Sequence, residues 1–378
     1  MELKTVDIEL RSIELYHVVM PLKHEFTTSF GSTLLRHCIL VRVVDRYGEE
    51  GWGEIPVDEG PWYSYEDIAT AWHIVKDFIA PKVLESTFAS PLDYWNLDIV
   101  KRIRGHNMAK SGIEQALWDL YARKLGKPLY QVLGGVRNHV VSGVSLGITR
   151  TVEELLKMIA KFLDEGYRRI KIKIKPGWDV EVVDRIRKEF PDIPLQVDAN
   201  AAYTLSDIPI LKKLDEYNLL MIEQPLHYDD LIDHATLAKH LKTPICLDES
   251  IKSVDDARKA IDIGACKIIN IKPARVGGLY PSLQIHNLCY ARNIAVWIGG
   301  MLETGIGRAH LVALGTLPNV RYPSDVSASD RYYEEDIVTE PWKLQNGVIY
   351  ARNIPGIGVE IDWRKLVKYL QNIHRITH

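Results

Sequence analysis

The sequence has little cysteine, no long apolar run and no apolar leader. Its four cysteines among 378 residues form no CxxC pair, which favours buried free thiols of a reducing compartment over a disulfide framework. The first residues, MELKTVDIELR, are charged from the second position and lack the apolar stretch of a secretory signal. No apolar run approaches the roughly 20 residues that a membrane helix needs. We therefore expect a cytoplasmic protein that does not bind membranes.

The sequence also lacks an excess of charge of either sign. Its net charge is -3 and its pI is about 6.5, so composition gives no electrostatic case for nucleic acid or an anionic membrane as a partner. With 46% hydrophobic and 26% charged residues, the chain has an ordinary globular composition. Its length allows two domains, or one large α/β barrel with an additional part.

The first 126 residues predict an α+β domain. Residues 1 to about 60 alternate apolar and polar side chains between turn signals, which is typical of an antiparallel meander. Within them, the polar and Gly-containing His24–Ser32 is predicted to be a mobile loop. Helical spacing follows, most clearly in SGIEQALWDLYARKLG, where Gly126 marks a stop. One face of that helix is expected to carry Ile113, Leu117, Leu120 and Tyr121.

From about residue 127 to 345, short apolar strands alternate with amphipathic helices. An early strand is VVSGVSLGI and a late one is AVWIGGM. Between them, charged residues recur at strand ends every 25 or 24 positions: Lys173, Asp198, Glu223, Asp248 and Lys272. This period suits one strand plus one helix, and right-handed βα units close into a parallel barrel. The sequence thus predicts an α/β fold, a modified TIM barrel (β/α)7β with an N-terminal α+β capping domain. We expect residues 346–378, including a terminal helix, to return to the cap.

The stretch RIKIKIKPG places Lys171 and Lys173 on one side of a strand, because residues two apart share a face. A solvated edge strand would explain this pattern. However, each repeat carries its charged residue at the strand's carboxyl end, where barrels of this kind form their active sites. We therefore expect both lysines to lie in the barrel mouth, and Lys175, past the strand end, to be solvated.

Three carboxylates, Asp198, Glu223 and Asp248, end three consecutive strands. Neighbouring strands are about 4.8 Å apart, so the three can converge on one cation. A hard divalent ion such as Mg²⁺ prefers oxygen ligands and keeps positions open for substrate. The alternative is that these acids only form salt bridges with the nearby lysines.

Lysines stand on both sides of this group. In a closed barrel, Lys173 and Lys272 would face a bound substrate from opposite sides. This arrangement suits removal of a proton next to a carboxylate, with the cation stabilising the enediolate and a lysine moving the proton. A non-catalytic barrel that binds a metal or a sugar acid is the other interpretation, although it does not require two flanking lysines.

Several motifs together resemble the muconate-lactonizing subgroup of the enolase superfamily, and most closely the o-succinylbenzoate synthase and N-succinylamino acid racemase family. They are SGIEQALWDLYARKLGKPLYQVLGG, RIKIKIKPGWD, LQVDANAAYTL, MIEQPL, LDESI, IKPARVGG and WIGGMLETGIGR. The use of a Lys base with Mg²⁺ is a known property of this superfamily. WIGGMLETG lacks the acidic DxD-type motif of dipeptide epimerases.

The resemblance implies roles for individual residues. Lys171 and Lys173 match the KxK motif with Lys173 as base, and Lys272 matches the lysine of the opposite face. The implied ligands of Mg²⁺, or of Mn²⁺, are Asp198, Glu223 and Asp248, and the implied substrate contacts are Ser145, Asn200, Gly300 and Met301. Arg275 matches an arginine of the racemase-containing branch and could tune Lys272, or could be a surface loop residue.

The implied activity is dehydration of 2-succinyl-6-hydroxy-2,4-cyclohexadiene-1-carboxylate to o-succinylbenzoate in menaquinone biosynthesis, by a homo-oligomer. Racemisation of N-succinyl or other N-acyl amino acids is the alternative. A specificity loop of the cap is expected to include Trp52, Glu54, Trp62 and Tyr63, unless these are packing residues. Glu249 is expected to support the metal ligand beside it.

Overall fold

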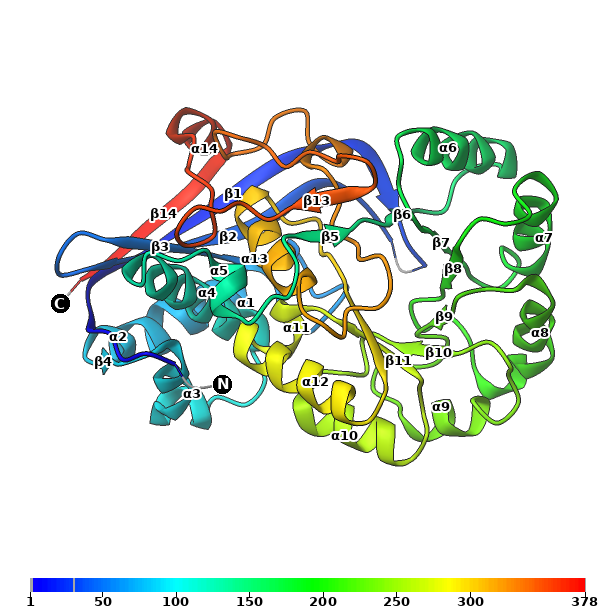
Figure 1. Ribbon diagram of the computed structural model, residues 1–378, viewed down its shortest axis with the longest axis horizontal. Coiled ribbons are helices and arrows are strands. Elements are labelled where there is room, and N and C mark those ends of the chain that lie inside the picture. The colour runs from blue at the N-terminus through cyan, green and yellow to red at the C-terminus, as the bar shows by residue number, and fades with distance from the viewer. Residues whose placement is uncertain (1–2, 30, 378) are drawn as a thin grey trace.

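The computed structural model describes residues 3–29 and 31–377. Its capping part is built on an antiparallel sheet with the strand order β14-β1-β2-β3 (Figure 1). The predicted meander is confirmed, because the first three strands pair in succession. The strands of this sheet are β1 (Ile8–Thr27), β2 (Ser32–Asp45), β3 (Glu50–Ile55), β14 (Leu370–Thr377) and, pairing with β1, β4 (Thr87–Phe88).

The β1–β2 hairpin occupies most of the segment that was predicted to be a loop. Thr27 pairs with Ser32, so β1 includes the first residues of that segment, while Phe30 lies outside the described residues. The loop prediction was therefore wrong for residues 24–27 and for Ser32, which belong to strands. Polar residues in a half-exposed hairpin lack the apolar alternation by which a buried strand is predicted. The hairpin reaches the barrel, where the Ile148 amide donates to the Thr27 carbonyl at 3.0 Å.

Helix α4 (Asn107–Lys124) confirms the clearest helical prediction, and Gly126 follows it with a φ of +62°. Its predicted apolar face is buried, but so is every residue from Met108 to Ala122. The polar side therefore forms a junction rather than a solvated surface. The Glu114 carboxylate accepts hydrogen bonds from the first backbone amides of α12 (Leu279–Ala291), those of Leu279 and Tyr280, at 2.7 and 2.8 Å.

The remaining helices of the cap are short. The first three helical segments follow one another without a break, the second of them in π geometry. The segments are α1 (Ile68–Ile74), η1 (Val75–Ile79), α2 (Ala80–Leu84), η2 (Pro91–Asn96) and α3 (Asp98–Arg102). A further short helix, α5 (Leu129–Val132), follows α4.

The second part is a parallel sheet of seven strands that curls with its helices outside, as Figure 1 shows from α6 to α12. Its strands are β6 (Val144–Leu146), β7 (Ile170–Lys173), β8 (Leu195–Asp198), β9 (Ile222–Glu223), β10 (Ile245–Leu247), β11 (Ile268–Ile271) and β12 (Ala295–Ile298). Its helices are α6 (Val152–Asp164), α7 (Val180–Glu189), η3 (Leu205–Asp207), α8 (Ile208–Lys213), η4 (Leu214–Tyr217), α9 (Ile232–Leu237), α10 (Val254–Asp262), α11 (Pro273–Val276), α12, α13 (Gly305–Gly315) and η5 (Ser329–Arg331).

An irregular segment closes the barrel between β12 and the strands at its other edge. Val320 forms a parallel bridge with Val296 of β12, and Ser324 forms one with Ser142 beside β5 (His139–Val141). The segment therefore takes the place of an eighth strand although it has no regular strand of its own. This arrangement confirms the predicted modified barrel with a capping domain.

The end of the chain returns to the cap. β13 (Val348–Tyr350) pairs with β5, and α14 (Trp363–Tyr369) leads directly into β14. The predicted terminal helix is thus only two turns long, because β1 provides a long edge on which β14 forms a strand. All four cysteines are buried and free, as expected. Among the described residues, no helix has the length and apolarity to cross a membrane.

Candidate active site

The charged residues that recur in the sequence meet at the carboxyl ends of the barrel strands. Parallel pairing places Lys173 beside Asp198, and Asp198 beside Glu223. Asp248 and Lys272 each follow their strand, β10 and β11, by one residue. All five side chains are buried, as is Lys171. The interpretation of RIKIKIKPG as a solvated edge strand is therefore wrong, whereas Lys175 is exposed as predicted.

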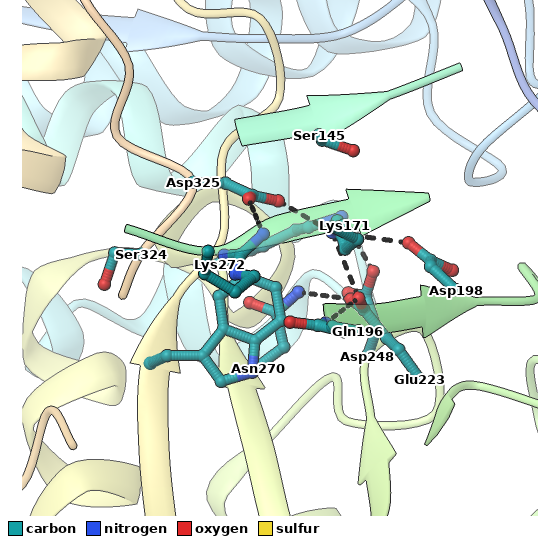
Figure 2. Close-up of polar contacts among 12 residues, drawn as sticks. Ser145, Lys171, Gln196, Asp198, Glu223, Asp248, Asn270, Lys272, Ser324 and Asp325 are labelled. Atoms are coloured by element: carbon teal, nitrogen blue, oxygen red, sulfur yellow. Dashed lines mark hydrogen bonds and ion pairs between the residues drawn. The ribbon is translucent and has the colours of Figure 1, made fainter. Parts of the chain in front are cut away.

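Lys171 lies at the centre of an ion-pair network (Figure 2). Its Nζ is 2.7 Å from Asp325, 3.0 Å from Glu223 and 3.3 Å from Asp198. It also lies 4.8 Å from the centre of the Trp297 ring, in cation–π range. Burial alone would lower the pKa of Lys171, but the three carboxylates outweigh it and raise the pKa above its usual value. Lys171 is therefore a fixed positive charge under the cavity.

Lys173 is held from its own side of the barrel. Its Nζ donates to Asp198 at 2.6 Å and to the Asn200 side-chain oxygen at 2.7 Å. Asn200 also donates to Glu249 at 2.8 Å, so Glu249 supports the amide that contacts the lysine. Burial would raise the pKa of Asp198, but the charges of Lys173 and Lys171 hold it below its usual value.

Lys272 has partners from the barrel and from the cap. Its Nζ is 2.8 Å from Asp248 and 3.2 Å from the Tyr63 hydroxyl. Arg275 donates to the other Asp248 oxygen and, at 2.7 Å, to the Ile251 carbonyl. Arg275 is buried, so its interpretation as a surface loop residue is wrong. Burial would lower the pKa of Lys272, but nearby acidic groups, Tyr63 first and then Glu249, raise it.

Two amides hold Glu223 inside the barrel. Gln196 and Asn270 each donate to one of its oxygens at 2.7 Å. Burial, followed by the charge of Asp198, raises the pKa of Glu223. A further positive charge at these oxygens would therefore stabilise the ionised carboxylate.

The three carboxylates do not form a preformed cation site. Among residues 3–29 and 31–377, no three carboxylate, histidine or cysteine side chains are grouped as a preformed metal site. Their oxygens face lysine and arginine side chains instead, which is the salt-bridge arrangement considered above. The donor set nevertheless fits a hard divalent ion, because it offers buried carboxylate oxygens on adjacent strand ends. Displacing the lysine and arginine side chains would make these oxygens available.

One cavity at the barrel mouth contains most of the predicted residues. Its lining includes the three lysines and, from the cap, Phe26, Thr28 and Tyr63. The four predicted substrate contacts line the same cavity: Ser145, Asn200, Gly300 and Met301. The β1–β2 hairpin thus stands over the lysines, where it can limit access of water.

The sequence did not reveal every residue of the site. Asp325 lines the cavity and also pairs with Arg169 at 2.7 Å, but it lies in the irregular closing segment. Gln196 and Asn270 could have been found two residues before the predicted Asp198 and Lys272, because residues two apart share a face.

The four residues that were expected to form a specificity loop of the cap lie in different places. Tyr63 contacts Asp248 and Lys272, whereas Trp62 is 63% exposed. Trp52 is buried against Tyr16. Glu54 accepts hydrogen bonds at the start of α13, outside the cavity lining.

Comparisons with known proteins identify the family. A profile described as the mandelate racemase / muconate lactonizing enzyme N-terminal domain matches residues 11–134, and one described as enolase C-terminal domain-like matches residues 154–365. The chain belongs to the enolase superfamily. It is 51% identical over 364 residues to o-succinylbenzoate synthase of Geobacillus kaustophilus, with 96% of each chain covered. It is 46% identical over 354 residues to N-succinylamino acid racemase of Thermus thermophilus, covering 94% of this chain and 95% of the relative.

A solved structure agrees with this placement. The crystal structure of an enolase superfamily member from Listeria innocua superposes with a TM-score of 0.94 at 38% identity. The match covers 98% of this chain and 99% of that one. The resemblance inferred from the motifs is thus confirmed along nearly the whole chain.

Proposed function

We propose that the protein is an o-succinylbenzoate synthase, a hydro-lyase that removes water from 2-succinyl-6-hydroxy-2,4-cyclohexadiene-1-carboxylate. The observation that carries the proposal is the pair of buried lysines, Lys173 and Lys272, in one cavity. Their strands, β7 and β11, lie four places apart in the sheet, and with the closing segment the ring has eight positions. The two lysine side chains are therefore expected to approach a substrate from opposite sides.

The cation is proposed to be Mg²⁺, with Mn²⁺ as a substitute, held by Asp198, Glu223 and Asp248. When bound, it would stabilise the negative charge that develops on the substrate carboxylate. Enolase-superfamily sites generally combine a lysine or histidine base with such ions. The carboxylates would exchange their present lysine and arginine contacts for the ion.

The lysines supply the proton chemistry. Lys173, as the neutral amine, takes the proton from the carbon next to the carboxylate, and the electron pair of that C–H bond forms the enediolate. The same group then returns a proton to the departing hydroxyl on its own face, so that water leaves. Lys272, which stays charged, and Lys171 stabilise the enediolate from the other face and from below. The hairpin over the cavity limits access of water.

Racemisation of N-succinyl or other N-acyl amino acids, an isomerase activity, is the second candidate. It is supported by the position of Lys272, which is buried as deeply as Lys173 and can protonate the face that Lys173 does not reach. The same enediolate serves both reactions, so one site can perform both. Arg275 is held against Asp248 beside Lys272, and we expect it to influence which reaction dominates.

The two-lysine assignment is tested by α-proton exchange in deuterated water with each enantiomer of an N-succinyl amino acid. Lys272→Ala should abolish racemisation in both directions, because racemisation needs a group on each face, yet should retain exchange of one enantiomer. Lys173→Ala should retain exchange of the other. Loss of a positioned acid–base group costs about 10²- to 10⁴-fold. Lys175→Ala, two residues past the end of the same strand and exposed, is the control and should keep both activities.

Two results would contradict the assignment: a Lys272→Ala enzyme that racemises at the wild-type rate, or one that exchanges both enantiomers equally. Dehydration should be measured with the same variants, and we expect Lys173→Ala to lose it most completely. Menaquinone biosynthesis as the pathway, a cytoplasmic location, homo-oligomeric assembly and the division into residues 1–126, 127–345 and 346–378 stay predictions.

A further inference from the structure

One side chain of the cap reaches into the barrel mouth and contacts one of the two lysines that flank the cavity. The Tyr63 hydroxyl lies 3.2 Å from Lys272 Nζ and 3.1 Å from an Asp248 oxygen. Lys272 Nζ also lies 4.5 Å from the centre of the Tyr63 ring, within cation–π range. The tyrosine thus contacts the ammonium group with both its ring face and its oxygen.

The contact is specific to one face of the site. Lys173 donates its hydrogen bonds to Asp198, the last residue of β8, and to Asn200, two residues further along the barrel. Lys272 instead shares Asp248 with Arg275 and has Tyr63 as a partner from the cap. The two lysines are therefore positioned by different parts of the chain.

We propose that Tyr63 is a positioning residue for Lys272, and that it sets how well this lysine delivers or removes a proton on its own face. Its hydroxyl donates to Asp248 and accepts from the ammonium group, while the ring limits where Nζ can move. Asp248 is also a proposed ligand of the cation. Of the two partners of Lys272, Tyr63 is therefore the one for which a bound ion does not compete. The inference rests on the proposed function, in which the two lysines serve opposite faces.

The test measures exchange of the substrate's α-proton without inversion of its stereocentre, which reports on each face of the substrate separately. Each enantiomer of an N-succinyl amino acid is incubated with Mg²⁺-loaded enzyme in deuterated water, and deuterium incorporated before inversion is measured by NMR. Lys272→Ala and Lys173→Ala first define which enantiomer each lysine serves. Tyr63→Phe removes only the hydroxyl, and Tyr63→Leu removes the ring as well. Tyr65→Phe is the matched control, because its hydroxyl lies in the same segment but bonds to the His106 amide at 3.1 Å.

For the enantiomer that Lys272 serves, exchange with retention should fall about 10-fold in Tyr63→Phe and about 100-fold in Tyr63→Leu. Racemisation should fall by the same factors in both directions, through a lower kcat at a nearly unchanged KM. Exchange of the other enantiomer should stay within about twofold of the wild-type rate, because the contacts of Lys173 are unchanged. Every rate of Tyr65→Phe should also stay within about twofold of wild type, because Tyr65 contacts neither lysine.

Equal losses for both enantiomers would overturn the proposal, because Tyr63 would then act on the whole site. A weaker affinity for Mg²⁺ in calorimetry, with equal losses, would indicate that it acts through Asp248 instead. Unchanged exchange in Tyr63→Leu would overturn the proposal as well. Failure of the proposed function is distinguishable, because the wild-type enzyme would then exchange neither enantiomer and would not dehydrate the cyclohexadiene carboxylate.

Discussion

Glu54 should make the stability of the protein fall as the pH rises. This carboxylate belongs to β3 of the cap, and it accepts hydrogen bonds from the Thr304 hydroxyl at 2.6 Å and the Gly307 amide at 2.9 Å. It is 1% exposed. Burial, followed by the charge of Glu303, raises the pKa of Glu54 from 4.5 to about 7 despite these donors. Glu54 therefore holds its proton more tightly in the folded chain than in the unfolded chain.

The direction and size of the effect follow from linkage. A raised carboxyl pKa stabilises the fold fully below pH 4.5, and the contribution is lost as the pH rises through about 7. At about 1.4 kcal/mol for each pKa unit, the free energy of unfolding should lose about 3 kcal/mol by pH 8. Glu54→Gln keeps the shape and one acceptor oxygen but cannot ionise, so this loss should disappear.

The assay is thermal unfolding of the wild-type and Glu54→Gln proteins between pH 5 and pH 8.5, with the difference in Tm plotted against pH. The difference matters more than either curve, because burial also raises the pKa of Glu66 and Glu114 to about 7 in both proteins. We expect the variant to gain several degrees relative to the wild type across this range. A difference that stays constant, or that changes in favour of the wild type at high pH, would refute the reasoning.

Three further predictions concern the site. Asp198→Asn, or chelation by EDTA, should remove nearly all turnover and leave the circular dichroism spectrum unchanged, and full activity in a metal-free preparation would contradict the cation assignment. Amides of residues 24–29 and 31–32 should exchange more slowly with a substrate analogue bound, and equal exchange with and without it would argue against a covering role for the hairpin. Asp325→Asn should lower kcat about 10-fold because Lys171 loses a charged partner at 2.7 Å. Asp336, which is also buried, accepts a hydrogen bond from the Gly305 amide at the start of α13, so Asp336→Asn should affect stability alone.

The sequence by itself determined the barrel and most of its charged residues. One strand and one helix form a local unit, so their repeat along the chain gives both the fold and the position at which each strand ends. The charged residues occupy that position or the next one: Lys173, Asp198, Glu223, Asp248 and Lys272. Parallel strands bring their carboxyl ends to one edge. Local patterns within each strand–helix unit, repeated every 24 or 25 residues, are sufficient for such predictions.

Only the tertiary structure decided how the lysines are held. Asp325 lies in a segment with no strand pattern, which reaches Lys171 only because it closes the barrel. The full burial of α4 depends on elements that pack around it from both parts of the chain, and the last residues form β14 because β1 offers them an edge. Tyr63 meets Lys272 across 209 positions of sequence. Such contacts are decided by packing between elements that are distant in the sequence, so the local spacing of side chains does not predict them.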